Sequence, residues 1–296
     1  MDTTPLNTRR PTSHSYFSQR LRLHYLDWGQ PPELDEAPAL LLVHGIQDHC
    51  RSWDWFAEAF LDRFRVIAPD LRGHGDSEWA QGGAYQQLDY VYDLAQLVEQ
   101  AELAPVTMVA HSMGGSLAAL YAGAYPDSVA RLVSIEGIGL WPGWTQGMAA
   151  DRRVREWVRG NRDLAGRLVR RYSSLDEAVA RMQRANPHLS PDQARHLTVH
   201  GANQNEDGTY SWKFDNYTHA WGAYGIPQDQ IVQLWSSITC PVLILNADGG
   251  FDHRIGHDGT DAYFRDVRVE TITDAGHWAH HDQLDEVVVQ CELFFG

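Results

Sequence analysis

Short apolar runs recur along this chain, and their alternation with helix-like patterns constrains the fold more than any other feature. The runs stand at residues 39–45, 65–70, 106–111, 131–136, 241–247 and 267–273. Runs of this length are typical of strands buried on both faces of a sheet. Helix-like patterns lie between several of them, at 53–63, 88–102 and 113–125. Strands that alternate with helices predict an α/β fold, in which a mostly parallel sheet carries helices on both faces.

Two further extended segments, 15–18 and 21–28, precede the first run and bring the expected strands to eight. The alternation stops between about residues 140 and 235, where amphipathic helix patterns take over at 151–172, 174–185 and 190–201. Ser174 and Ser190 are suitable N-caps, and Pro191 suits a first helical position. These patterns predict a core of residues 1–139 and 236–296, interrupted by a helical insertion of residues 140–235 at one edge of the sheet.

The charge balance argues against a nucleic-acid partner. Lysine and arginine total 24 and aspartate and glutamate 39, so the formal net charge is −15, whereas binding to phosphates needs a basic surface. No stretch of about 18 consecutive apolar residues occurs, so we expect no membrane span. The first residues, MDTTPLNTRR, lack the apolar run of a signal peptide, and a cytoplasmic protein is the expectation.

The three cysteines, Cys50, Cys240 and Cys291, are widely spaced and odd in number. They indicate neither a disulfide framework nor a zinc pattern. Cys50 is close to one of the loops described below, where its thiol could be accessible. We expect no cofactor and no metal ion.

The strongest chemical signal is the segment VAHSMGG at 109–115, which follows a buried strand and opens a helix-like pattern. It matches the nucleophile elbow G-x-S-x-G, with Ala110 at the first glycine position. A sharp strand-to-helix turn admits only small side chains two residues before and after the serine, and Ala110 and Gly114 meet that demand. The hydroxyl of Ser112 would then stand above a helix N-terminus, which favours negative charge. Ser112 is therefore the candidate nucleophile.

A second signal is the segment HGIQDH at 44–49, directly after the strand at 39–43. Acyl transfer needs two preorganised donors for the developing oxyanion. One is expected from the residue after the nucleophile, the backbone N–H of Met113. The other is expected from the loop after this strand, the backbone N–H of Ile46.

A candidate general base lies near the end of the chain, in DAGHWAHHD at 274–282. His277 stands between Gly276 and Trp278, in a loop after the last strand that can lean over Ser112. His280 and His281 are expected to be exposed or structural.

Together, HG after a strand, DLRGHGDS at 70–77, HSMGG at 111–115 and the late GHW resemble the α/β-hydrolase superfamily. The resemblance covers nearly the whole chain. It implies an α/β-hydrolase fold with a mostly parallel eight-stranded sheet, and it equates the inserted helices with a cap domain. With serine at the elbow it implies a serine hydrolase. In DLRGHGDS, the resemblance assigns Asp70, Arg72 and Gly73 structural roles.

The acid that would complete the triad is less regular. In most of the family it follows the strand equivalent to 241–246, where this chain has Ala247, Asp248, Gly249 and Gly250, with glycine at the aspartate position. Asp248 and Asp252 are displaced candidates. Glu136 ends the strand 131–136, which should neighbour the nucleophile strand, and it is similar in position to the acid of a branch that includes many haloalkane dehalogenases. We expect Glu136, with Asp248 or Asp252 as alternatives.

These residues favour a cofactor-free hydrolase of a small or medium carboxylic ester, acting through a Ser-His-acid triad and an acyl-enzyme. Carbon–carbon bond hydrolases, lactonases and amidases share that triad, and a non-catalytic ligand-binding member of the fold is a further alternative. Trp141 and Trp144 at the start of the insertion, with Trp278 beside the base, predict a pocket for a hydrophobic acyl or aromatic group. The sequence leaves the oligomeric state open.

Overall fold

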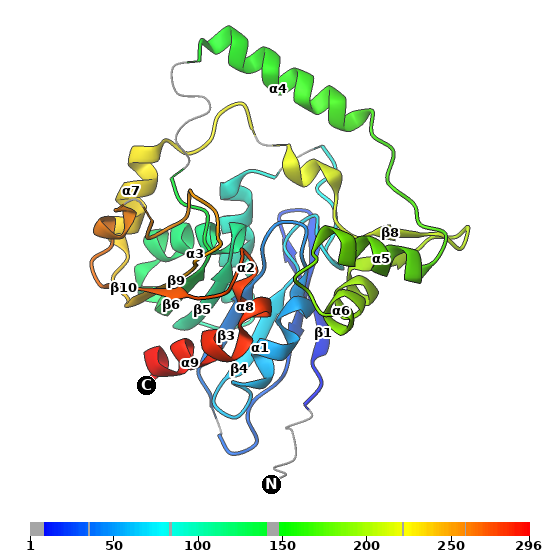
Figure 1. The fold of residues 1–296 in the computed structure, drawn as a ribbon. Coiled ribbons are helices and arrows are strands. Elements are labelled where there is room, and N and C mark those ends of the chain that lie inside the picture. Colours follow the sequence, from blue (N-terminus) through cyan, green and yellow to red (C-terminus); the bar gives the residue numbers. More distant parts are fainter. Residues whose placement is uncertain (1–8, 35, 83–84, 141–147, 221, 258) are drawn as a thin grey trace.

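A computed structural model describes residues 9–34, 36–82, 85–140, 148–220, 222–257 and 259–296 of the chain. Within these residues, eight strands form one sheet in the order β1-β2-β4-β3-β5-β6-β9-β10 (Figure 1). The strands are β1 (Thr12–Ser18), β2 (Leu21–Asp27), β3 (Ala39–Val43), β4 (Arg65–Pro69), β5 (Val106–His111), β6 (Val129–Ile135), β9 (Val242–Ala247) and β10 (Val267–Ile272). This confirms the predicted eight-stranded sheet.

The sheet is parallel except at one end. β2 runs antiparallel to both β1 and β4, while the pairs from β4 through β10 are parallel. Carboxyl ends of the parallel strands therefore meet at one edge of the sheet, and the loops after β3, β5, β6 and β9 lie together there. This edge is where the sequence places its chemical residues.

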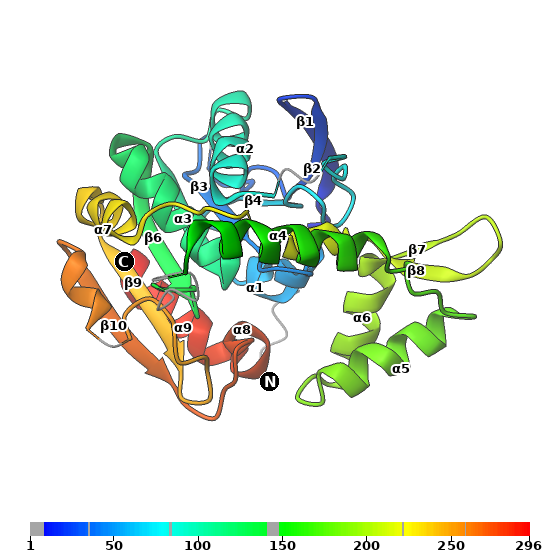
Figure 2. The ribbon, with the colours of Figure 1, turned by 90° about the horizontal axis from the view of Figure 1, so that it is seen from above.

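Alternating side chains of the central strands build two separate cores. Leu41, Val43 and Met108 pack on one face, and Leu40, Leu42 and Val109 pack on the other. The first face is covered by helices α2 (Gln87–Gln100), α3 (Met113–Ala124) and α7 (Gln228–Ser237). The second is covered by α1 (Asp54–Glu58) and α9 (Leu284–Phe295). Figure 2 shows α2 and α3 on one side of the sheet and α9 on the other.

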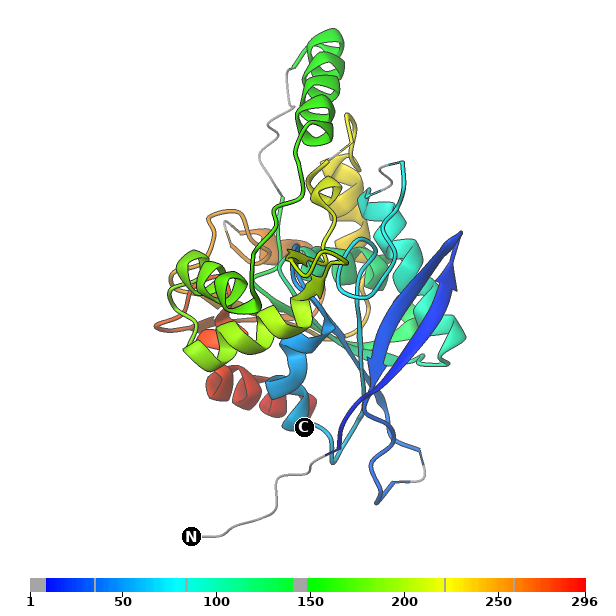
Figure 3. The same ribbon diagram turned by 90° about the vertical axis from the view of Figure 1, so that its right-hand side faces the viewer.

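The insertion between β6 and β9 holds helices α4 (Ala150–Ala165), α5 (Leu175–Ala185) and α6 (Pro191–Gly201), followed by the hairpin β7 (Ala202–Gln204) and β8 (Tyr210–Trp212). The hairpin was not expected from the sequence, because its strands are only three residues long. α4 stands apart from the body of the chain (Figures 1 and 3), and none of its residues is buried. α7 packs against α3, on the core. The domain boundaries remain a prediction.

The helix termini follow the expected chemistry. The side chain of Ser174 accepts a hydrogen bond from the Glu177 N–H, and Ser190 forms a reciprocal capping box with Gln193, with Pro191 as the first helical residue. α1 ends at Glu58 and α4 at Ala165, several residues earlier than expected.

In the described part of the chain, none of the helices combines the length and the apolar character that crossing a membrane would require.

Candidate active site

Ser112 lies at the turn between β5 and α3 with φ 55° and ψ −122°. A non-glycine residue rarely adopts a positive φ, so the surrounding backbone must hold this conformation. The Ser112 N–H donates to the Ile135 carbonyl at 3.0 Å. A Cβ on Gly114 would lie 2.5 Å from the carbonyl oxygens of Val43 and His44, so only glycine fits there. These contacts explain the small residues around the serine.

The loop after β3 lies against this turn. A Cβ on Gly45 would stand 3.0 Å from the Ser112 Cβ. His44 shapes the loop from within the core: its Nδ1 contacts the Gly45 carbonyl at 2.7 Å, and its Nε2 accepts from the Leu71 N–H at 3.0 Å. Burial and the neighbouring His74 lower the pKa of His44 to about 3, which keeps the ring neutral and fits this pair of hydrogen bonds.

His277 reaches Ser112 and Glu136 at once. Its Nε2 lies 2.8 Å from the Ser112 Oγ, and its Nδ1 lies 3.3 Å from the Glu136 Oε2. An imidazole placed between a hydroxyl and a carboxylate can accept the hydroxyl proton while the carboxylate stabilises the resulting positive charge. The structure therefore brings together three of the residues that the sequence selected.

The loop that carries His277 is held at several points. The His111 Nε2 lies 2.8 Å from the His277 carbonyl, and the Asp282 carboxylate accepts from the Gly276 N–H at 2.8 Å. Asp248 accepts from the N–H groups of Asp274 and Ala275 at 3.0 and 3.2 Å. These bonds lower the Asp248 pKa. Asp248 thus supports the loop that carries His277.

Glu136 is buried at the end of β6, with φ 50°. Its Oε1 accepts from the Ala247 N–H at 2.7 Å, and its Oε2 accepts from the Phe251 N–H at 3.2 Å. The Arg254 Nε lies 3.4 Å from Oε1. Two backbone donors and a guanidinium compensate the desolvation of this carboxylate, as a buried charge requires.

Gly250 explains why an acid is missing from the usual position. A Cβ there would lie 2.2 to 2.4 Å from the Glu136 carboxyl atoms. The Glu136 carboxylate occupies the space that a side chain at residue 250 would need. Asp252, the remaining candidate, is exposed.

The loop after β9 adds two residues that the sequence analysis did not select. The Phe251 ring lies 4.0 Å, centroid to centroid, from the His277 ring, and Arg254 lies beside Glu136. Both follow a parallel strand at the shared sheet edge, and that position is the signal by which they could have been found.

Histidines fill the space behind His277. His280 and His281, which we expected to be exposed or structural, are both buried, as is His111. Burial lowers the pKa of His111 and His280 well below the ordinary value and that of His281 to about 3, so all three are neutral at pH 7.

The segment 70–77 packs as a structural loop. Arg72 is fully buried and bonds Asp93 through two nitrogens, at 2.6 and 2.7 Å. Gly73 has φ +73°, and a Cβ there would lie 2.5 Å from the Tyr85 ring. The Asp70 carboxylate accepts from the Cys50 N–H at 2.7 Å and the Asp76 N–H at 2.9 Å.

A cavity of about 650 Å³ extends from Ile46 and Trp278 to the inserted helices. Its lining is partly apolar and partly cationic. The apolar members include Tyr172, Met182, Leu197, Trp212, Phe214 and Trp278, and the cationic ones are Arg167, Arg170, Arg181 and Lys213. Trp278 thus lines a cavity as expected, while Trp141 and Trp144 lie outside the described residues. The arginines were missed because their helical pattern indicates an amphipathic helix and no ligand.

A family model described as alpha/beta hydrolase fold matches residues 38–284 of the chain. The chain is 28% identical over 256 residues to the sn-1-specific diacylglycerol lipase ABHD11 of Mus musculus, covering 83% of this chain and 77% of that protein. It is 32% identical over 183 residues to Lipase LipV of Mycobacterium tuberculosis, covering 59% and 61%.

Other curated relatives match over less of their length. A serine hydrolase-like protein of Danio rerio is 25% identical over 214 residues, which are 71% of this chain and 65% of that protein. The chain covers 30% of an uncharacterized protein of Mycobacterium tuberculosis. It therefore spans less than two thirds of the length of these relatives.

Among solved structures, the thioesterase domain from the curacin biosynthetic pathway superposes with a TM-score of 0.82 at 21% identity, covering 95% of this chain and 99% of that one. An esterase from Mycobacterium tuberculosis superposes with a TM-score of 0.71 at 21% identity, covering 98% and 92%. At this level of identity the likeness concerns the fold alone.

Proposed function

Because the chain belongs to the α/β-hydrolase fold family, we propose that it is a serine hydrolase that cleaves a small or medium carboxylic ester through an acyl-enzyme. The observation that carries the proposal is the position of His277, 2.8 Å from the Ser112 hydroxyl and 3.3 Å from the Glu136 carboxylate. The names of relatives, which include lipases, are consistent with ester chemistry.

In the proposed mechanism His277 takes the proton of Ser112 as the Oγ attacks the ester carbonyl. Glu136 orients the imidazole and stabilises its charged form. The backbone N–H groups of Ile46 and Met113 hold the oxyanion. Met113 is the first residue of α3, where helix N–H groups have no partner within the helix. His277 then protonates the leaving alcohol, and a water molecule that it activates hydrolyses the acyl-enzyme.

The cavity beside Ile46 suggests what the substrate carries. Its aromatic and aliphatic lining suits a hydrophobic acyl or aromatic group. The arginines of the lining favour an additional anionic group at a distance from the ester bond, because a carboxylate or phosphate can bond a guanidinium through two oxygens. We therefore infer that an ester with an apolar chain and an anionic end is preferred.

The decisive experiment measures hydrolysis of p-nitrophenyl esters of increasing acyl length by the protein and by Ser112→Ala. We expect turnover in the protein, a fall of about 10⁴-fold or more in the variant, and covalent labelling of the protein by a fluorophosphonate probe that the variant abolishes.

Each outcome separates the alternatives. Labelling without turnover of any ester would move the proposal to another substrate of the same triad, such as a lactone or an amide. Neither labelling nor turnover, in a protein whose circular dichroism is that of a folded chain, would contradict a serine hydrolase and favour a non-catalytic ligand-binding member of the fold.

A further inference from the structure

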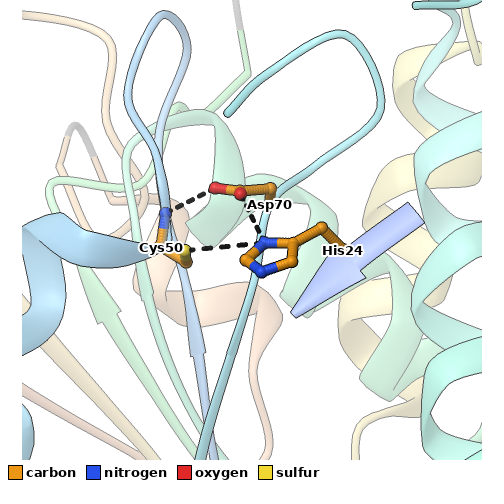
Figure 4. A group of neighbouring side chains, drawn as sticks. All are labelled: His24, Cys50 and Asp70. Carbon is orange, nitrogen blue, oxygen red and sulfur yellow. Dashed lines mark hydrogen bonds and ion pairs between the residues drawn. The ribbon is translucent and has the colours of Figure 1, made fainter. Parts of the chain in front are cut away.

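A second group of reactive side chains lies outside the Ser112 site. His24 comes from β2, Cys50 begins a short 3-10 helix (Cys50–Trp53) after the β3 loop, and Asp70 directly follows β4; all three are buried. One donor atom from each lies within 4.8 Å of the other two. Figure 4 shows the Cys50 sulfur and the Asp70 carboxylate turned toward the same nitrogen of the His24 ring.

The distances are close to those of a coordination sphere. The His24 Nδ1 lies 2.7 Å from the Asp70 Oδ2 and 4.0 Å from the Cys50 Sγ. At the usual Zn–N, Zn–O and Zn–S lengths, tetrahedral coordination would put these pairs about 3.4 and about 3.5 Å apart. The first pair must move apart by about 0.7 Å and the second must approach by about 0.5 Å, which side-chain rotation can provide.

A further buried histidine, His49, lies beside this group. His49 is buried, and its Nε2 lies 2.9 Å from the Leu197 carbonyl, whereas its Nδ1 is buried without a hydrogen-bond partner among the described residues. Buried polar atoms are rarely left unpaired. His49 lines the same cavity, of about 260 Å³, as His24, Cys50 and Asp70. The cavity offers a small ion a place beside all four side chains.

The surroundings suit a divalent ion in two further ways. The His24 Nε2 lies 2.8 Å from the Ser13 Oγ, which can accept a hydrogen bond from it, and a histidine ligand commonly donates its other N–H in this way. One thiolate and one carboxylate together balance the double charge of the ion, so the buried site would be neutral.

We propose that His24, Cys50 and Asp70 bind a zinc ion, with water as the fourth ligand. Sulfur, imidazole and carboxylate form a donor set that zinc accepts. Binding releases the thiol proton of Cys50 to solvent. The single proton of the neutral His24 ring, which lies on Nδ1 when that nitrogen bonds Asp70, moves to Nε2 and is bonded there to Ser13, so that Nδ1 can bind the ion. No electron transfer is involved.

The test uses cobalt(II) as a spectroscopic substitute for zinc in the full chain. We expect one equivalent to produce a near-ultraviolet thiolate-to-cobalt charge-transfer band and visible bands of tetrahedral cobalt, and we expect zinc to displace both. Cys50→Ser should abolish the charge-transfer band, and His24→Gln should weaken cobalt binding at least tenfold.

The matched controls are the other two thiols and a second buried group. Cys240→Ser and Cys291→Ser should leave the band unchanged. His280→Gln should do so as well, because His280 belongs to a different cluster with Asp48 and His111. The absence of the band in the folded protein, or its persistence in a folded Cys50→Ser variant, would overturn the proposal. The test does not depend on esterase activity, so the two proposals can fail separately.

Discussion

At the scale of single residues, the candidate acid and the glycine opposite it form a mutually exclusive pair. Glu136 and Gly250 follow the neighbouring strands β6 and β9, and the Glu136 carboxylate fills the space that a side chain on Gly250 would take. Only one of the two positions can carry an acid beside His277. The glycine that looks like a lost catalytic residue in the sequence makes room for the carboxylate of Glu136.

We predict that Glu136→Gln lowers kcat by about 10³- to 10⁴-fold, since the amide no longer stabilises the charged imidazole and can hold the wrong tautomer. Ester hydrolysis under saturating substrate measures the effect. Asp252→Asn, at an exposed position, should keep kcat within about twofold of the value for the unchanged protein. Asp248→Asn should lower kcat less than about tenfold, because it weakens only the hydrogen bonds to the loop of Asp274 and Ala275. If Asp248→Asn loses its turnover while Glu136→Gln keeps it, Asp248 is the acid.

At the scale of the elements, α3 and α7 pack in close contact. A Cβ on Gly123 would lie 2.2 Å from the Leu234 carbonyl oxygen and 2.6 Å from its carbonyl carbon. The backbone of α7 therefore approaches α3 at a distance that only glycine permits. α3 begins with Met113, directly after Ser112, so this contact also fixes the helix behind the candidate nucleophile.

We predict that Gly123→Ala lowers the free energy of unfolding by about 1 to 3 kcal/mol, because the methyl group separates the two helices. Gly160→Ala in α4 is the matched control. A Cβ there meets no atom within 4 Å, and alanine favours a helix by about 1 kcal/mol over glycine. Urea denaturation measures the stability of both variants. Equal denaturation midpoints for Gly123→Ala and the unchanged protein would show that the α3–α7 contact does not require glycine.

The inserted elements supply most of the apolar lining of the larger cavity and all four of its cationic side chains. α5 contributes both Met182 and Arg181 to the lining, one turn of the helix presenting an apolar and a cationic group together. The neighbouring Arg184 belongs to the same helix but is exposed and is not among the lining residues. A comparison of variants at Arg181 and Arg184 therefore distinguishes the effect of a charge in the cavity from the effect of the overall charge of the helix.

We predict that Arg181→Ala raises KM about three- to tenfold for an ester with a terminal carboxylate and leaves a neutral ester of equal length nearly unchanged. The reason is the loss of one charge-assisted hydrogen bond in a partly exposed site. Arg184→Ala should change neither constant. Equal effects on both esters would refute a selective role of Arg181.

At the scale of the whole molecule, the buried histidines make stability depend on pH. Burial is the main cause that lowers the pKa of His44 and His281 to about 3 and that of His74 to about 4. In the unfolded chain these rings bind protons near pH 6.5, whereas in the folded chain they bind protons only at the lower pH values given above. Stability is therefore full above pH 6.5 and falls as the pH drops toward 4. The buried carboxyls of Asp48 and Asp93, whose pKa values are raised, act in the opposite sense.

We predict a lower free energy of unfolding at pH 5 than at pH 7, by about 1.4 kcal/mol per pH unit for each additional proton bound on unfolding. Urea titrations at the two pH values measure the difference. His281→Gln should reduce the number of protons bound on unfolding, which is the slope of the unfolding free energy against pH, by about one. His14→Gln, at an exposed position, should leave that slope unchanged. Equal stability at both pH values would show that the buried rings do not control unfolding.

The sequence by itself determined where the sheet strands lie along the chain, because an apolar run between turn residues is the direct result of burial on both faces of a sheet. It also selected Ser112 and His277, since a sharp turn needs small neighbours and each residue follows a strand. Local chemistry likewise placed the caps at Ser174 and Ser190. These features depend on residues close together in the chain.

Only the tertiary structure decided which carboxylate faces His277 and where the cavity and the buried histidines lie. Glu136 reaches the imidazole across 141 positions of the chain, and Gly250 makes room for it from a third segment. The group of His24, Cys50 and Asp70 is assembled in the same way from three separate elements. Such contacts depend on strand order and on packing volume, which no local pattern encodes.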